Sequence, residues 1–327
     1  MPLTFIRNDI TTVPADAIVN AANSGLAPGG GVCGAIFAAA GYDKLERACR
    51  AIGHCPTGEA VITKGFRLPA RYIIHTVGPV WQGGSRHEPE QLRSCYRNSL
   101  LLAEKNGCTS IAFPLISAGI FGYPKGEALR IAVDTIRAFL ETHEMEVILV
   151  LFDRGAALLS KELLGELQSF IDNHYVETHQ FSRTRAEQPY FEAPAMAAPF
   201  SMRDTLSSLD DVLSNLDKPF SAALLRLIDE KGMTDVEVYK HANIDRKLFS
   251  KLRKPGYTPS KQTVLALAIA LRLDLDETAD LLRRAGYALS HSSKSDVIFE
   301  YFIRKGRYDI YEINQTLFAY DLKPAGS

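Results

Sequence analysis

A run of three glycines between an apolar segment and a helical segment constrains the fold of this chain more than any other feature. Residues 17–19 are Ala-Ile-Val, as in a strand covered on both faces, and a helical pattern starts near residue 34. Gly29, Gly30 and Gly31 have no Cβ, so their backbone can lie directly against a ligand. Free N–H groups at a helix start favour anions. The order of strand, glycine loop and helix therefore predicts a phosphate-binding site.

Two carboxamide side chains strengthen this prediction. A glycine run alone is also typical of a flexible turn, which has no ligand. Here Asn20 and Asn23 precede the run, with only alanines between them. Polar side chains at the end of a strand, followed by bare backbone and a helix start, favour a nucleotide site over a plain turn.

Strand and helix patterns alternate through the first half of the chain. Strand patterns lie at about 3–7, 16–20, 58–63, 71–77, 110–116 and 146–152, and helical periodicity fits about 34–51, 89–106, 124–142 and 157–173. This alternation predicts an α/β sandwich with a central sheet. Ligands of such sheets bind beyond the carboxyl ends of the strands, where the glycine loop and a second small-residue loop at 117–122 are expected.

The segment 16–41 resembles the signature of macrodomains, the modules that bind ADP-ribose: a strand, Asn-Ala-Ala-Asn, Gly-Gly-Gly-Val and a helix. Other motifs extend the resemblance over about residues 3–173, namely Asn-Asp-Ile-Thr at 8–11, Cys-Pro-Thr-Gly-Glu-Ala at 55–60, Ile-His-Thr-Val-Gly-Pro at 74–79 and Ser-Ala-Gly-Ile-Phe-Gly at 117–122. Asn8 stands where the family has glycine. The resemblance implies a three-layer α/β/α sandwich with a mixed central sheet over residues 1–175. Its ligand would be ADP-ribose, with no cofactor and no metal.

The resemblance also implies a role for each site residue. Asp9, with Ile10 beside it, would accept from the adenine amino group, and Phe152 would pack on the adenine ring. Asn23 would bind the distal ribose, and Asn23 and Asn20 are the expected catalytic residues. The diphosphate would lie between the two small-residue loops, with contacts from Gly30, Gly31, Val32, Ser117, Ala118, Gly119, Ile120 and Phe121.

Simpler structural roles remain open for several of these residues. Asp9 is equally suited to cap the turn that follows it. Phe152 and Phe121 are also suited to ordinary packing. His75 lies inside an apolar strand, which predicts a buried, hydrogen-bonded histidine rather than a catalyst.

Two replacements bear on whether the first region is an enzyme. MacroD-like hydrolases carry Asp after Gly-Gly-Gly-Val and His four residues later, whereas this chain has Cys33 and Phe37. The usual base for a water is therefore missing, although a water held beside a ligand phosphate can attack without it if the geometry is fixed. We favour an ADP-ribosyl hydrolase, or a deacetylase of O-acetyl-ADP-ribose. A non-catalytic reader of ADP-ribosylated partners and an ADP-ribose-responsive regulator are the alternatives.

The second half is predicted to be a linker followed by a helical domain. Residues 176–217 contain three prolines, an acidic excess and an amphipathic helix over 204–216. Residues 218–322 are helical in pattern, and 234–254 resemble the helix-turn-helix of Cro/repressor proteins, with Asn243 at a turn that needs positive φ. The side chains expected to face outward toward DNA are Arg246, Lys247, Ser250, Lys251, Arg253 and Lys254.

A protein partner remains an alternative to DNA, because Leu248 would be an exposed apolar residue on the same helix. The aromatic-rich segment after Gly286 is predicted to be a helical cover or a dimer surface, which leaves a homodimer open. No apolar run is long enough to cross a bilayer, and the start of the chain lacks a signal-peptide layout. The five cysteines form no CxxC pair. We therefore expect a cytoplasmic protein with reduced thiols and no membrane contact.

Overall fold

The computed structural model describes residues 2–151 and 219–326. The strands of the first range are β1 (Leu3–Ile6), β2 (Ala17–Ala21), β3 (Ala60–Lys64), β4 (Tyr72–Thr76), β5 (Ser110–Pro114) and β6 (Glu146–Val150). They form one mixed sheet in the order β1-β6-β5-β2-β4-β3. Neighbouring strands are parallel except β3, which runs antiparallel to β4. The predicted mixed α/β sheet is confirmed.

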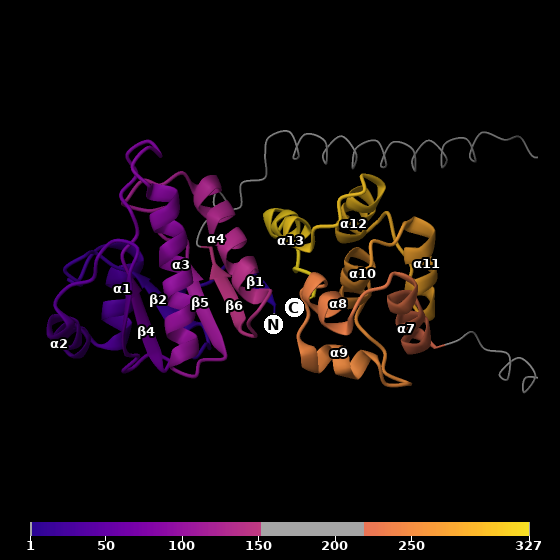
Figure 1. Cartoon of the computed structure of the whole chain (residues 1–327), viewed down its shortest axis with the longest axis horizontal. Coiled ribbons are helices and arrows are strands. Elements are labelled where there is room, and N and C mark those ends of the chain that lie inside the picture. Colours follow the sequence, from indigo (N-terminus) through magenta and orange to yellow (C-terminus); the bar gives the residue numbers. More distant parts are fainter. Residues whose placement is uncertain (1, 152–218, 327) are drawn as a thin grey trace, which may run out of the picture.

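Helices cover both faces of this sheet (Figure 1). They are the 3₁₀ turn η1 (Ile10–Thr12) and the helices α1 (Gly31–Ala40), α2 (Tyr42–Ile52), α3 (Glu88–Lys105) and α4 (Lys125–Leu140). Tyr96 of α3 and Ile131 of α4 belong to the core on one face, whereas Ile36 of α1 and Leu45 of α2 belong to the core on the other. Two apolar cores, one on each side of a central sheet, are what a three-layer arrangement requires.

The helix predicted over 34–51 is two helices in the structure. Gly41 ends α1 and begins α2 with φ of 99°, a backbone conformation that other residues rarely adopt. The Arg67 side chain also lies 3.1 Å from the place where a Cβ on Gly41 would stand. Apolar periodicity continued across this break, so periodicity alone joined the two helices. The predicted helix 157–173, the linker 176–217 and the helix 204–216 lie outside the described residues.

The second described range is entirely helical, as predicted. Its helices are α7 (Phe220–Glu230), α8 (Asp235–His241), α9 (Arg246–Leu252), α10 (Lys261–Ala270), α11 (Leu275–Arg284), α12 (Lys294–Arg304) and α13 (Ile310–Ala319). Every residue from Thr263 to Ala270 is buried, so α10 is the centre of this region. Reciprocal capping boxes at Thr234 with Glu237 and at Asp274 with Glu277 fix the starts of α8 and α11.

One expectation for the helical region is wrong, and one of two alternatives for its aromatic-rich segment is favoured. Leu248 is only partly exposed and packs against the helical core, so it is not a free apolar residue on α9. In the aromatic-rich segment, Phe299, Tyr301 and Phe302 are buried inside the same core. Their burial makes this segment a helical cover, and the homodimer alternative receives no support. Asn243 does have the expected positive φ, at 54°.

The helical region lies against the outer edge of the sheet (Figure 1). Phe318 of α13 is buried in the core beneath α3 and α4, and its ring centroid is 6.3 Å from that of Phe5 in β1. The two described ranges therefore share an apolar contact at β1. No helix in either range is long and apolar enough to cross a membrane.

Candidate functional site

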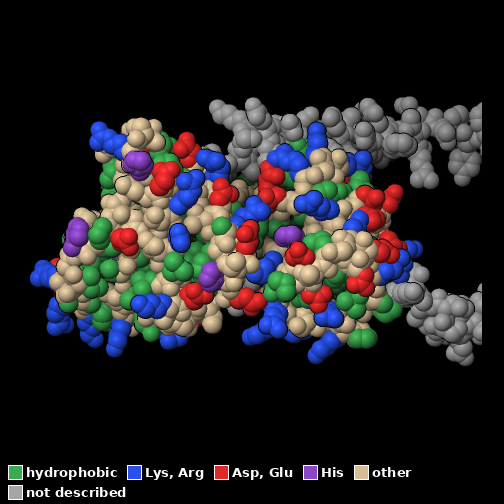
Figure 2. All heavy atoms as spheres, in the orientation of Figure 1, with side chains coloured by type: hydrophobic (Ala, Val, Ile, Leu, Met, Phe, Trp, Pro, Cys, Tyr) green, Lys and Arg blue, Asp and Glu red, His purple; other side chains and the backbone are tan. Residues whose placement is uncertain are grey.

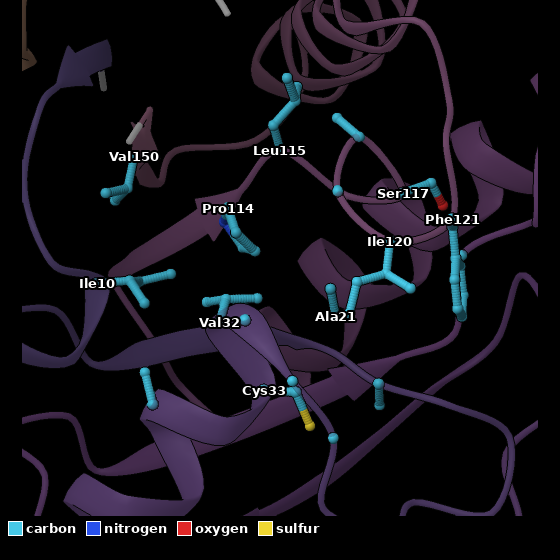
Figure 3. A pocket seen from close by; sticks show the side chains of 18 of the residues that line it. Ile10, Ala21, Val32, Cys33, Pro114, Leu115, Ser117, Ile120, Phe121 and Val150 are labelled. Atoms are coloured by element: carbon cyan, nitrogen blue, oxygen red, sulfur yellow. The ribbon is translucent and has the colours of Figure 1, made fainter. Parts of the chain in front are cut away.

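A cavity of about 630 Å³ opens at the carboxyl ends of the parallel strands (Figure 3). Its wall is made by the segments that follow β1, β2, β5 and β6, as expected for a sheet of this type. The lining residues are Asn8, Asp9, Ile10, Ala21, Ala22, Asn23, Gly29, Gly30, Gly31, Val32, Cys33, Ala35, Gly78, Pro114, Leu115, Ser117, Ala118, Gly119, Ile120, Phe121, Lys125, Val150 and Leu151.

The glycine loop presents backbone to this cavity. Gly30 is the N-cap of α1 and has no side chain to bond the first N–H groups of the helix. Gly31 has φ of 61°, and a Cβ on Gly34 would lie 2.7 Å from the Gly29 carbonyl oxygen. Only glycine permits this close contact between loop and helix. The N–H groups at the start of α1 are therefore left for an anion.

The second small-residue loop faces the first. Ile120 is 80% exposed and points toward the glycine loop, with its Cδ1 3.3 Å from the place of a Cβ on Gly30 (Figure 3). Ser117 has φ of 63°, and its buried hydroxyl has no hydrogen-bond partner among the described residues. An unpaired buried hydroxyl is costly unless something binds it. These two loops border the cavity from opposite sides, as two walls of an anion site would.

An anchored loop supports the second wall. The Glu88 carboxylate is buried and accepts backbone N–H groups from Gln82, Gly84 and Arg86. Burial would raise the pKa of Glu88, but these N–H groups hold it below its usual value. The anchored segment also carries Trp81, whose N–H donates to the Phe121 carbonyl at 2.9 Å. A backbone hydrogen bond from Trp81 thus fixes the Phe121 end of the second loop.

Asn23 lines the cavity, and its carboxamide also shapes the glycine loop. Its Nδ2 donates to the Ala27 carbonyl at 2.7 Å, and its Oδ1 accepts from the Ala27 N–H at 3.0 Å. Both polar atoms thus already hold the turn that leads to the glycines. This loop-forming role was not part of the sequence-based prediction.

Asn20 lies behind the cavity wall, near the end of β2. It is fully buried and absent from the cavity wall, so a direct contact with the ligand is not what the structure supports. Its Nδ2 lies 3.0 Å from His75 Nδ1 and 3.6 Å from Cys33 Sγ. Asn20 and His75 are partners in the register of β2 and β4, so their side chains lie on the same face of the sheet and can meet. Asn20 therefore contacts Cys33 from behind the wall.

His75 is a buried, hydrogen-bonded residue, as expected. Its Nε2 lies 2.9 Å from Thr63 Oγ1, and burial lowers its pKa to about 4. The imidazole is therefore neutral near pH 7. If Asn20 donates to Nδ1, the proton of the neutral ring lies on Nε2 and points to Thr63.

The two replaced positions have different surroundings. Cys33 lines the cavity, with its sulfur beneath the glycine loop. Phe37 is 1% exposed, packs against the Tyr42 ring and belongs to the core between α1, α2 and the sheet. A side chain at position 37 consequently faces the core in this chain.

Asp9 caps the turn that follows it, as one interpretation of the sequence predicted, and it also lines the cavity. It is exposed at the cavity wall and caps η1, with Oδ1 accepting from the Thr11 N–H at 2.9 Å. Asn8 in turn accepts from the Asp9 N–H at 2.8 Å, so the replacement of the family glycine adds a local hydrogen bond. Ile10 is buried beside them. Phe152 lies outside the described residues.

Sequence reasoning missed several wall residues. Lys125, the first residue of α4, is the one cationic side chain among the described lining residues, and Leu115 and Val150 add apolar wall. The proline before this helix indicated a helix start, but not that the start faces the cavity. The apolar sequence of β6 did not indicate that Val150 lines the cavity, because buried strand ends and cavity walls have similar apolar residues.

The outward-facing residues predicted on α9 are all exposed: Arg246, Lys247, Ser250, Lys251, Arg253 and Lys254. Arg253 pairs with Asp235 at 2.5 Å. Figure 2 shows Lys and Arg side chains gathered over α9 at the lower edge of the helical region. The helix therefore presents positive charge, although the structure shows only that it is helical and basic.

Comparison with known proteins identifies the first half of the chain. The Macro domain family model matches residues 19–132. A macro domain-containing protein of Chlorobaculum tepidum is 61% identical over 135 residues, 41% of this chain and 78% of the relative. An O-acetyl-ADP-ribose deacetylase of Citrobacter rodentium is 50% identical over 167 residues, 49% of this chain and 94% of the relative. The solved macrodomain of Oceanobacillus iheyensis with ADP is 42% identical, with 51% and 92% coverage and a TM-score of 0.47. This chain belongs to the macro domain family.

Proposed function

We propose that residues 1–175 bind ADP-ribose and hydrolyse the ester of O-acetyl-ADP-ribose. The observation that carries this proposal is the cavity between two small-residue loops, in a region that is 50% identical to a protein named O-acetyl-ADP-ribose deacetylase over 94% of that protein. A diphosphate fits between the loops, because bare glycine backbone and the start of α1 supply N–H donors. Lys125 adds a positive charge on the same wall.

The remaining site residues take the roles that the family resemblance implies. Asp9, Ile10 and Phe152 bind the adenine end. Asn23 binds the distal ribose at the other end of the cavity and takes part in the reaction. Asn20, for which the resemblance also implied a catalytic role, lies behind the wall and supports Cys33 from there. The diphosphate is held by Gly30, Gly31, Val32, Ser117, Ala118, Gly119, Ile120 and Phe121.

Ester hydrolysis makes modest demands on this site. A water must be held against the acetyl carbonyl, and donors must stabilise the oxyanion that develops on it. Backbone N–H groups of the loops can supply such donors. A carboxylate base would speed the water's attack, and this chain has the Cys33 thiol at that position. We therefore expect turnover of the ester that is slower than in a site with aspartate.

The test compares binding with turnover. The full chain is titrated with ADP-ribose by calorimetry and incubated with O-acetyl-ADP-ribose and with a mono-ADP-ribosylated protein. We expect binding, release of acetate, and loss of both in Asn23→Ala, because the glycine loop loses its anchor. Binding without release from either substrate would favour the reader. No binding at millimolar ADP-ribose would overturn the proposal.

We also propose that the helical region directs the protein to DNA. The favouring observation is the exposed basic face of α9, on which Arg246, Lys247 and Lys251 have no ion-pair partner among the described residues. A gel-shift titration of the full chain at low salt should show binding, and the triple variant with glutamine at these positions should lose it. Absence of a shift at low salt would leave a protein partner. A substitution of Leu248 would not test that partner, because Leu248 packs against the helical core.

A further inference from the structure

The outer strand of the sheet is closed by one side chain of the helical region. The Leu3 N–H donates to Asn243 Oδ1 at 2.8 Å, and Asn243 Nδ2 donates to the Leu3 carbonyl at 2.9 Å. Both groups are buried, although the residues are 240 apart in sequence. The carboxamide thus takes the place that the peptide group of a neighbouring strand would take. Asn243 joins the helical region to the backbone of β1.

The geometry around Asn243 leaves it little freedom. Its φ of 54° is one that asparagine and glycine tolerate, and its side chain is 2% exposed. Its N–H donates to the Lys240 carbonyl at 3.0 Å. The C-terminal segment passes so close that a Cβ on Gly326 would lie 2.3 Å from the Ala242 carbonyl oxygen. Backbone on both sides therefore fixes where the carboxamide points.

Further contacts hold the same strand at alternate residues. After Leu3, the Phe5 ring meets Phe318. Arg7 then pairs with Asp321 at 2.7 Å and lies over the Phe318 ring at 5.4 Å. The helical region consequently holds β1 along its length. The chain enters the cavity wall directly after this strand, at residues 8–10.

A second set of contacts fixes the helical region to α4. Arg137 pairs with Asp309 at 2.8 Å, and the Tyr239 hydroxyl donates to Glu144 at 2.9 Å. Lys240 Nζ donates to the Glu141 carbonyl at 2.6 Å. These contacts hold α8 and α13 against the end of α4, while Asn243 holds β1. Because the helical region bonds to both β1 and α4, it fixes the position of β1 relative to the rest of the sheet region instead of only burying its edge.

We propose that Asn243 is a positioning residue for the adenine end of the cavity. It fixes β1 and, through it, the place of Asp9 and Ile10 in the wall. This inference rests on the proposed ADP-ribose function. A loosened β1 weakens contacts with the base but leaves the loops at Gly30 and Ser117 unchanged. The KM for O-acetyl-ADP-ribose should therefore rise while kcat stays the same.

The test uses Asn243→Gly in the full chain, because glycine keeps the positive φ and removes only the carboxamide. Calorimetry measures the Kd of ADP-ribose and of its hypoxanthine counterpart, which lacks the amino group expected to meet Asp9. We expect the wild type to prefer ADP-ribose. In Asn243→Gly the ADP-ribose Kd should rise about fivefold or more, with little change for the hypoxanthine ligand.

Two further variants separate positioning from stability. Leu281→Ala opens a cavity in the helical core away from β1 and should lower the melting temperature without changing either Kd. Asp321→Asn keeps the shape at a positive φ, breaks the Arg7 ion pair and should shift the preference in the same direction, by less. Asp321→Asn provides the test of the proposal if Asn243→Gly fails to fold.

The outcomes are distinct. If the wild type binds ADP-ribose and Asn243→Gly leaves both Kd values unchanged, or raises both by the same factor, the positioning role is wrong and the proposed function stands. If Asn243→Gly does not fold, and Asp321→Asn folds and keeps the wild-type preference for ADP-ribose, the positioning role is again wrong. If the wild type binds no ADP-ribose, the proposed function fails, and this inference fails with it.

Discussion

The cavity and the basic helix α9 are built from opposite materials. The two loops that border the cavity expose much backbone and several small side chains, and the geometry of the first loop depends on Gly31 and Gly34, where φ is positive or a Cβ does not fit. The face of α9 consists of long charged side chains on an ordinary helix. Glycines in a fixed order have few other uses, whereas Lys and Arg cover many solvated helices. The comparison shows why the first site identifies its ligand class and the second does not.

The difference also concerns tolerance. A backbone-built site fails when an added side chain occupies the space of the ligand or strains a backbone that needs glycine. A side-chain-built surface loses its interactions one charge at a time. Substitutions of matched chemistry in the two regions should therefore differ in size, and the following predictions run from the largest effect to the smallest.

Adding a carboxylate to the glycine loop should abolish ligand binding. Gly30→Glu places a negative side chain where the diphosphate is expected and against Ile120, whose Cδ1 is 3.3 Å from a Cβ at this position. We expect the Kd for ADP-ribose to rise about a thousandfold, or about 4 kcal/mol. Calorimetry measures it, with Ala38→Glu on the exposed side of α1 as the control. Binding retained by Gly30→Glu would show that the loop is not the phosphate site.

The polar network behind the wall should make stability depend on pH. The pKa of His75 is about 4 when folded and near 6.5 when unfolded. Between these values the unfolded chain binds the extra proton, so stability falls as pH decreases, by about 1.4 kcal/mol per pH unit. The loss reaches about 3 kcal/mol near pH 4. Urea unfolding from pH 4 to 7 measures it.

Matched histidine variants decide whether His75 causes this dependence. His75→Gln should flatten the profile, and His54→Gln, at an exposed position, should leave it as in the wild type. An equal slope in all three proteins would assign the pH dependence to other groups.

Much of the fold followed from the sequence because its signals were local. Short segments of the sequence were enough to predict the positions of the strands and of the glycine loop, and also the positive φ at Asn243. The hydrogen bond of Asn20 was not predictable in this way, because its partner His75 lies in the neighbouring strand, 55 residues away. The contact of Asn243 with Leu3 joins groups 240 residues apart, and no local pattern records such a pairing. Lys125 was missed as a wall residue for the same reason, since most of the wall comes from residues distant from it in sequence.

Restoring a carboxylate at position 33 should raise turnover. Cys33→Asp places an acceptor near Asn20 Nδ2 and at the cavity wall, where it can act on a water. We expect at least about a tenfold increase in kcat for O-acetyl-ADP-ribose, at the low end of general-base effects. Cys33→Ser is the control of similar size without a charge. Equal rates for Cys33→Asp and Cys33→Ser would mean that the reaction needs no base at this position.

A histidine at position 37 should not add to that gain. Phe37 is buried beside Tyr42, so Phe37→His would place a polar ring in the core instead of the cavity. We expect it to lower the melting temperature and leave kcat unchanged.

The smallest expected effect belongs to a single charge on α9. If the helical region binds DNA, each phosphate that it neutralises adds about −0.9 to the log–log slope of affinity against salt. Lys251 is exposed and has no ion-pair partner among the described residues, so Lys251→Gln should make the slope about one unit shallower. The affinity lost between about 50 and 200 mM salt should then be about 3.5-fold smaller than in the wild type. Lys294→Gln on α12, also exposed, is the control and should keep the wild-type slope. Identical slopes for Lys251→Gln and the wild type would place the DNA contacts elsewhere and make α9 an ordinary solvated helix. A shallower slope in Lys251→Gln alone would assign the DNA contact to α9, so that this charged surface, like the glycine loops, has a defined ligand.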